Sequence, residues 1–506
     1  MQGQHGNTLR DMEERNSFYS KCVGDNVKKV AFHNLGCKVN SYEIEVMQQK
    51  LLEQGYHIVP FDEAADIYIV NTCTVTNIAD RKSRQMLHRA KQRNPEAVVV
   101  AVGCYVQTGL NVLKQDDSVD LAIGNNRKKD IVEILERYLS TREGKESTCE
   151  KEMEPHTVDK TLGGTTVPDI AHTYEYEEMQ LRQTAEHTRA YIKIQDGCNQ
   201  FCSYCAIPLA RGRVRSRRAE DILTEVQGMV NAGYKEVVLT GIHISSYGID
   251  FDSGRWEQGM SVPASRGERP DYSGNGRLID LIEQVHRTEG LKRLRLGSLE
   301  PRIITAETAD RLAALPKLCP HFHLSLQSGC DATLKRMNRH YTVGEYYESV
   351  EHLRRAFELP AITTDVIVGF PGETEEEFEL TKTFLEKVGF YEMHIFKYSR
   401  RDGTVAAKLP NQVPEEVKNH RSEQLFELEK MQSQRFRGRY IGREAEILLE
   451  ETKEIQGQYF YLGHTKDYVK IAVPYVENDD TFRSGQILKV TVDSFLTDEI
   501  LQGEVG

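Results

Sequence analysis

The sequence lacks a long apolar run. None of its 506 residues belongs to a stretch that approaches the ~20 consecutive apolar residues of a membrane-spanning helix. The first thirty residues carry charged and polar side chains throughout, which is atypical of a secretory signal. We therefore expect a soluble, cytoplasmic protein that does not contact a membrane.

Positive charge is also scarce. The chain has 65 Lys and Arg against 77 Asp and Glu, a formal net charge of -12 at pH 7. This balance excludes a generally basic surface, so any nucleic acid must be bound by local basic patches. The chain does have ten cysteines. In a reducing cytoplasm these are better explained as metal ligands or catalytic thiols, with a few core fillers, than as disulfides.

The length suffices for roughly three domains of ~150 residues. Apolar periodicity and polar interruptions divide the chain into distinct segments. A long polar loop, 250–277, interrupts the second α/β segment. We expect a flexible tail over 1–27, an α/β domain over 28–140, a linker over 141–187 that includes Cys149, a second α/β domain over 188–436 and a small all-β barrel over 437–506.

Apolar strands alternate with helices in the first domain, a pattern typical of a parallel sheet. Cys37, Cys73 and Cys104 end the predicted strands "VKKVAFHNLGC", "ADIYIVNTC" and "AVVVAVGC". Ligands of open parallel sheets bind at the carboxyl ends of the strands. A single cysteine at such a position is equally well explained as a small apolar residue that fills space in the core. Three at the same topological position favour a shared metal site.

Six strand-helix repeats in the second domain predict a partial or full barrel of the TIM kind, with its active site at the carboxyl ends of the strands. Directly after the first of these strands, "DGCNQFCSYC" supplies Cys198, Cys202 and Cys205 without a nearby fourth cysteine. A structural zinc ion takes four ligands, and a catalytic one usually includes His. A [4Fe–4S] cluster normally takes four thiolates, so three would leave one iron open.

This cysteine spacing after the first barrel strand closely resembles the radical S-adenosylmethionine (radical SAM) superfamily. The resemblance implies that the open iron chelates the methionine moiety of SAM. It also implies that Tyr204 lies against the adenine, that Gly241 of "LTGIH" contacts the methionine group, and that Glu300 of "GSLEP" contacts the remainder of the cofactor. His243 and His323 are equally well explained as buried histidines of the core. No catalytic residue beyond the cluster ligands is expected.

Two incomplete cysteine triads followed by a small β-barrel resemble the methylthiotransferases, whose last domain is a TRAM domain. The resemblance covers nearly all of residues 28–505. The segments "NLGCKVNSYE" and "HFHLSLQSGCDATLKRMNRHYT" are similar to those of the MtaB type, which acts on threonylcarbamoyladenosine beside the tRNA anticodon. Lys38 and Val39 stand where the isopentenyladenosine branch has Gln-Met and the ribosomal-protein branch has Pro-Lys.

This resemblance implies two [4Fe–4S] clusters, SAM, tRNA and a low-potential electron donor such as flavodoxin or ferredoxin. The cluster on Cys198, Cys202 and Cys205 would reduce SAM and release a 5'-deoxyadenosyl radical. The cluster on Cys37, Cys73 and Cys104 would hold sulfur, accept a methyl group from a second SAM and deliver methylthio to carbon 2 of the adenosine at tRNA position 37. Such chemistry is a cofactor's, because no general base removes hydrogen from that carbon.

Two alternatives stay open: a methylthiotransferase for isopentenyladenosine or for a ribosomal-protein aspartate, and a non-enzymatic iron-sulfur or zinc RNA-binding protein. The RNA contact is predicted at "ARGRVRSRR". An extended chain there would place its arginines on one face to neutralise phosphates, although a solvated basic strand would look the same. These arginines are Arg211, Arg213, Arg215 and Arg217.

Overall fold

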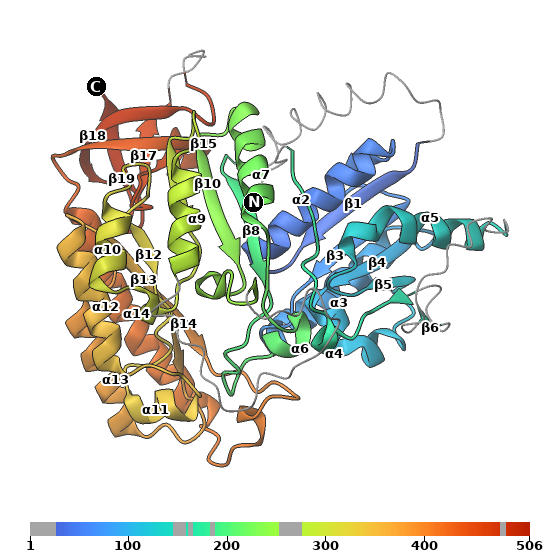
Figure 1. Ribbon diagram of the computed structural model, residues 1–506, viewed down its shortest axis with the longest axis horizontal. Helices are drawn as coiled ribbons and strands as arrows, with labels where there is room; N and C mark the ends of the chain where they lie inside the picture. Colours follow the sequence, from blue (N-terminus) through green and yellow to red (C-terminus); the bar gives the residue numbers. More distant parts are fainter. Residues whose placement is uncertain (1–26, 145–157, 160–164, 183–187, 252–275, 476–481) are drawn as a thin grey trace.

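The computed structural model describes residues 27–144, 158–159, 165–182, 188–251, 276–475 and 482–506. Figure 1 shows an α/β domain (blue to cyan), a large central barrel (green to orange) and a small β-barrel (red). The expected tail over 1–27, Cys149 and most of the loop over 250–277 lie outside the described residues. Across the described ranges, no helix combines the length and the apolar character needed to cross a bilayer.

The first domain contains the predicted parallel sheet, in the order β2-β1-β3-β4-β5-β7-β6. Strands β3 and β4 are buried along their whole length, which explains their continuous apolar sequence. The strands are β1 (Lys29–Asn34), β2 (His57–Val59), β3 (Ile67–Thr72), β4 (Val98–Gly103), β5 (Leu121–Ile123), β6 (Val158–Asp159) and β7 (Thr165–Thr166). The helices are α2 (Lys38–Glu53), α3 (Asn77–Arg93), α4 (Cys104–Leu113) and α5 (Ile131–Arg142), with the short 3-10 helix η1 (Lys128–Asp130).

The described part of the predicted linker is packed rather than free. Strand β7 pairs with β5 and extends the first sheet, and the short helix η2 (Ile170–His172) follows. The Tyr176 hydroxyl donates a 2.8 Å hydrogen bond to the carbonyl oxygen of Lys193 in the second domain. Met179 and Leu181 are buried in the shared core. Residues 165–182 therefore join the two α/β domains, because their few apolar side chains are buried between them.

The second domain contains the six predicted parallel strands, arranged as an open barrel. One sheet has the order β11-β10-β8-β9 and the other β12-β13-β14, and the bridges Leu294–Leu318 and Leu299–Leu324 connect β11 to β12. The six are β8 (Ala190–Asp196), β10 (Glu236–Gly241), β11 (Arg293–Leu296), β12 (His321–His323), β13 (Ala361–Val368) and β14 (Glu392–Lys397), and the short β9 (Arg215–Ser216) pairs antiparallel with β8. The helices are α6 (Ile207–Arg211), α7 (Ala219–Asn231), α9 (Gly276–His286), α10 (Ala306–Ala313), α11 (Asp331–Arg336), α12 (Val343–Ala356) and α13 (Glu375–Val388), with the 3-10 helices η3 (Ile244–Ser246), η5 (Pro301–Ile303) and η6 (Ala406–Lys408).

A small closed barrel follows the long helix α14 (Glu415–Gly438), as predicted. Its strands are β15 (Glu444–Ile455), β16 (Gln458–His464), β17 (Lys470–Pro474), β18 (Ile487–Phe495) and β19 (Leu501–Val505). The turn between β16 and β17 lies against the amino ends of the large barrel's strands. The Tyr468 ring lies 4.9 Å from the guanidinium of Arg189 and 4.6 Å from that of Arg295. The small barrel therefore covers the end of the large barrel opposite its cysteines.

Candidate functional site

The first cysteine triad lies at the carboxyl edge of the first sheet. Cys37 follows β1 and caps α2, Cys73 follows β3, and Cys104 begins α4 directly after β4. These three strands are neighbours and parallel, so their ends meet. Burial, together with the charges of the neighbouring thiols, raises the pKa of Cys37 and raises that of Cys73 to about 11. The structure thus brings the three predicted residues together.

The loops of this edge are fixed by Gly103 and Asn40. Gly103 has φ +96°, and a Cβ there would lie 2.3 Å from Asn71 Oδ1 and 2.6 Å from the Thr72 carbonyl oxygen. Only glycine fits this close approach of two strand ends. Asn40 donates through Nδ2 to the carbonyl oxygens of Leu35 and Thr72, both at 3.2 Å. The loops that carry Cys37 and Cys73 are therefore linked to each other.

The second triad lies at the carboxyl end of β8. Cys198 follows the strand directly, and Cys202 and Cys205 lie in the loop before α6. Burial and the nearby Cys202 thiol raise the pKa of Cys198 to about 12. The backbone N–H of Gln200 donates to Cys198 Sγ at 3.5 Å, and Arg339 Nη1 donates to Cys202 Sγ at 3.3 Å. Donors therefore already point at sulfur atoms of this triad.

A single buried arginine connects the two triads. Arg211 is the last residue of α6, which follows the second triad, and its Nε donates to Cys104 Sγ of the first triad at 3.2 Å. Its Nη1 donates to Glu43 at 2.8 Å and to Asp196 at 3.1 Å. Asn125 Nδ2 also approaches Cys104 Sγ, at 3.7 Å.

Positive charge exceeds negative charge around Arg211. Four fully buried cationic side chains surround three buried carboxylates, those of Glu43, Asp196 and Glu177. The cations are Lys128, Lys193, Arg211 and Arg215. Buried charge is costly unless it is compensated, so this excess suits an anionic group at the adjacent Cys37 and Cys104 thiols. An iron-sulfur cluster with thiolate ligands is such a group.

The spacing of the thiols also suits a cluster. Thiolates that share one zinc ion at ~2.3 Å would have sulfur atoms about 4 Å apart. Among the described residues, neither triad has all its sulfur atoms within 4.8 Å of one another. A [4Fe–4S] cluster binds each thiolate through a different iron, which separates the sulfur atoms further. The thiols of each triad are therefore too far apart to share a single ion in this arrangement, which is compatible with a [4Fe–4S] cluster.

The other predicted SAM contacts follow barrel strands at the same end. The Tyr204 ring packs edge-on against Phe370, 6.4 Å between centroids. Gly241 ends β10, where a Cβ would lie 3.0 Å from the Gln195 carbonyl oxygen. Glu300 is buried and accepts a 2.7 Å hydrogen bond from Arg302 Nε. Contact of these three residues with a cofactor stays a prediction.

The prediction of four phosphate-binding arginines is wrong for three of them. Arg211, Arg215 and Arg217 are buried, and Arg217 pairs with Glu225. The reason is that β9 pairs antiparallel with β8, which encloses the segment within the barrel wall. Arg213 alone of the four is partly exposed, and its guanidinium lies 4.3 Å from the centroid of the Phe201 ring.

The arginines that contact cysteines were not identified from the sequence. The sequence predicts a phosphate contact for Arg211 and indicates no role for Arg339. A sequence motif shows that an arginine is present, but it does not show which group the guanidinium contacts. His243 is half-buried and hydrogen-bonded: Nδ1 lies 2.6 Å from Ser246 Oγ, and desolvation by the surrounding protein lowers its pKa to about 3.

Comparisons with known proteins agree with this geometry. Residues 29–124 match the family described as "Uncharacterized protein family UPF0004", and residues 192–385 match the radical SAM superfamily. The threonylcarbamoyladenosine tRNA methylthiotransferase MtaB of Bacillus subtilis is 38% identical over 92% of this chain and 93% of its own length. The tRNA-2-methylthio-N(6)-dimethylallyladenosine synthase of Moorella thermoacetica is 34% identical over 93% and 96%.

A solved structure shows the same fold. The radical S-adenosylmethionine methyltransferase TsrM of Kitasatospora setae, solved with cobalamin and a [4Fe-4S] cluster bound, superposes with a TM-score of 0.50. It covers 75% of this chain and 74% of its own, at 15% identity. The predicted α/β fold with a radical SAM barrel is thereby confirmed.

Proposed function

The chain belongs to the methylthiotransferase family of radical SAM enzymes, and we propose that it adds a methylthio group to carbon 2 of N6-threonylcarbamoyladenosine at tRNA position 37. The observation that carries this proposal is the pair of cysteine triads that the buried Arg211 connects. Two of the relatives named for this substrate are 38% identical over 85% or more of the chain.

We assign one [4Fe–4S] cluster to each triad. When bound, the two clusters and SAM supply the electron, the 5'-deoxyadenosyl radical and the sulfur that the reaction needs. The chain's own residues set the charge around them. Arg211 and Arg339 each donate a hydrogen bond to a cysteine sulfur, which stabilises the thiolate form. The close link between the triads keeps radical formation and sulfur delivery near one substrate atom.

Lys38 supports a substrate with an anionic substituent. It follows Cys37 directly, solvent reaches its side chain, and no hydrogen bond or ion pair of its ammonium group occurs among the described residues. Burial and the guanidinium groups of Arg295 and Arg189 lower its pKa to about 8. A carboxylate would pair with this ammonium group. An apolar isopentenyl tail would leave it without a partner, which costs ~1–3 kcal/mol.

The tRNA contact is proposed for the rim around the two triads. Exposed apolar side chains occur here on loops and helix starts of both α/β domains: Val75, Ile78, Phe201, Leu209 and Val405. The loops touch one another, because Ser399 Oγ accepts from the Asn77 backbone N–H at 3.2 Å and a Cβ on Gly403 would lie 3.0 Å from Leu209. Unstacked bases of an RNA loop pack on such side chains, and Arg213 would reach a phosphate.

A low-potential donor such as flavodoxin or ferredoxin would supply the electron, and we propose the cytoplasm as the site of the reaction. The test is anaerobic incubation of the reconstituted enzyme with SAM, dithionite and tRNA that carries threonylcarbamoyladenosine. Mass spectrometry of the nucleosides should show the 2-methylthio derivative. The Cys37→Ala variant should cleave SAM without forming this product, and Cys202→Ala should do neither. SAM cleavage without any methylthio product from the wild type would overturn the proposal.

A further inference from the structure

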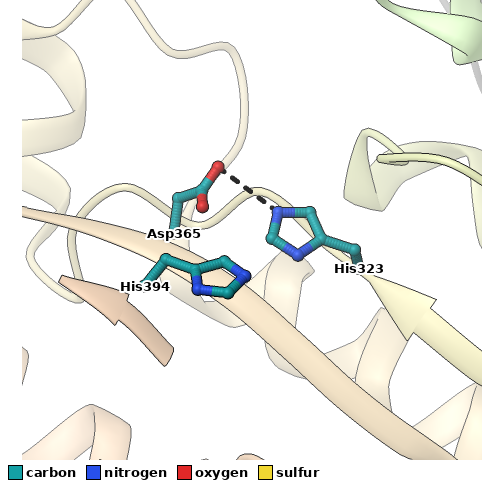
Figure 2. Close-up of side chains that lie close together, drawn as sticks. All are labelled: His323, Asp365 and His394. Atoms are coloured by element: carbon teal, nitrogen blue, oxygen red, sulfur yellow. Dashed lines mark ion pairs between the residues drawn. The ribbon is translucent and has the colours of Figure 1, made fainter. Parts of the chain in front are cut away.

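Three polar side chains lie together inside the large barrel (Figure 2). His323 of β12, Asp365 of β13 and His394 of β14 place one nitrogen or oxygen atom each within 4.8 Å of one another. His323 Nε2 lies 3.3 Å from Asp365 Oδ2, and its Nδ1 lies 3.0 Å from Thr363 Oγ1. The two histidine rings lie 5.7 Å apart at 27°. The set is called the His-Asp-His triad below.

The strand pleat places this triad in the barrel interior. Ile362, Val366 and Val368 of β13 belong to the core that packs under the outer helices, so the alternate residue Asp365 faces inward. Ile367, also on the inner face, packs in the same cluster as Tyr204 of the second cysteine loop. Ile367 therefore marks the level of the cysteine loop along β13. Asp365 lies two residues before it on the strand, which is about 7 Å deeper in the barrel.

His394 has hydrogen-bonding capacity that the protein does not use. It is exposed, and within the described ranges it makes no hydrogen bond or ion pair, only the ring contact with His323. Asp365, its partner in the strand register, is bonded to His323 instead. His323 in turn is fixed on both sides, by Asp365 and Thr363. The triad thus presents one oriented imidazole and one unpartnered imidazole to the interior.

A hydrogen-bonding ligand suits this arrangement better than a metal ion. A metal lies in the plane of each imidazole that binds it, so two rings that share an ion direct their nitrogen lone pairs at one point. Rings inclined by only 27° and 5.7 Å apart hold theirs in nearly parallel planes. Of the two rings, only His394 has nitrogen atoms without a protein partner among the described residues, so it is the ring that can bind a polar group.

We propose that the His-Asp-His triad binds the threonylcarbamoyl substituent on N6 of the substrate adenosine. This inference rests on the proposed function. Carbons 2 and 6 of adenine flank the same ring nitrogen, so a base with carbon 2 at the reaction centre carries its N6 substituent only a few ångströms away. His394 donates to the carboxylate or hydroxyl of that substituent, while Asp365 and Thr363 hold both nitrogens of His323 and so fix the ring against which His394 lies.

Positive charge on the same inner face compensates the carboxylate. His321 lies two residues before His323 on β12, so both face the interior. Burial lowers the pKa of His321, and the charges of Arg295 and Lys38 lower it further, which places these cations near that face. A carboxylate at the triad therefore lies between the unpaired His394 and cationic side chains, whereas an apolar substituent would satisfy neither.

A binding cycle tests this assignment without catalysis. The affinities of wild type and His394→Ala are measured, with the full reconstituted chain, for tRNA that carries threonylcarbamoyladenosine and for the same tRNA with unmodified adenosine. We expect His394→Ala to weaken binding of the modified tRNA about tenfold or more, the loss of one hydrogen bond to a charged group, and to leave the unmodified tRNA unaffected. His394→Gln, which keeps a donor, should restore part of the loss.

The controls separate this inference from the proposed function. His420→Ala, on the exposed face of α14, should bind both tRNAs as the wild type does. Equal losses on both tRNAs, or no loss on either, would overturn the assignment even if the wild type forms the methylthio product. Stoichiometric binding of added Zn²⁺ that is lost in His394→Ala, with no change in tRNA selectivity, would overturn it in favour of a metal site. Iron content, measured on every variant, confirms that the clusters are intact.

Discussion

Arg211 Nε donates a hydrogen bond to Cys104 Sγ at 3.2 Å, although the two residues belong to different domains. The same guanidinium contacts Glu43 of the first domain and Asp196 at the end of the first barrel strand. The two cysteine triads are therefore connected by buried charges rather than by a flexible hinge. This connection fixes the distance between the two proposed clusters.

Removing this arginine should destabilise the whole chain. Arg211→Gln would leave Glu43 and Asp196 buried with fewer positive partners, which typically costs ~3–5 kcal/mol. Arg213→Gln, two residues away and partly exposed, is the matched control and should change the free energy of unfolding by no more than ~0.5 kcal/mol. Anaerobic denaturant unfolding measures both. Equal stability of the two variants would show that the buried network is unimportant.

The iron content should report two clusters. Anaerobically reconstituted protein should hold about eight irons per chain, four in each [4Fe–4S] cluster. Replacement of Cys198, Cys202 and Cys205 by Ala should leave about four, and so should replacement of Cys37, Cys73 and Cys104. Iron analysis with Mössbauer spectroscopy makes the measurement. Protein that holds zinc and no iron would contradict the assignment of both triads.

The strand ends with their cysteines were predictable because continuous apolar runs fix where parallel strands lie, and Cys37, Cys73 and Cys104 each follow one. The burial of the Arg215 side chain was not predictable, because it depends on a two-residue pairing of β9 with β8. Nor could the sequence bring His323, Asp365 and His394 together, since their proximity depends on the register of three strands. Segment 165–182 contains too few apolar residues to show the packing that it makes.

The salt dependence of tRNA binding should reflect one arginine of "ARGRVRSRR" rather than four. Arg213 is the partly exposed member of "ARGRVRSRR", so Arg213→Gln should reduce the slope of log affinity against log salt by up to about 0.9, the contribution of one phosphate contact on duplex nucleic acid. Phe201→Ala should weaken binding with little change of slope, because stacking involves no counterion. An unchanged slope in Arg213→Gln would remove this residue from the proposed tRNA surface.

Asp467 should make the small barrel less stable as pH rises. Burial raises its pKa to about 6, whereas an unfolded Asp titrates near 3.9. Between these values the folded state binds the extra proton, so stability falls as pH increases from about 4 to about 6, by up to ~3 kcal/mol. Asp467→Asn keeps an acceptor for the Tyr440 hydroxyl and avoids the buried charge. Its melting temperature should exceed that of the wild type at pH 7 and match it near pH 4; a variant that is less stable at pH 7 would contradict this account.

The most direct test of the proposed substrate compares two tRNAs that differ only in the N6 substituent of adenosine 37. Reconstituted enzyme is incubated with SAM, dithionite and either the threonylcarbamoyl or the isopentenyl form, and the nucleosides are quantified by mass spectrometry. Lys38 and His394 supply donors that only the threonylcarbamoyl group satisfies, so its 2-methylthio product should form at least tenfold faster. Equal rates on both tRNAs, or a faster reaction of the isopentenyl form, would contradict the assignment.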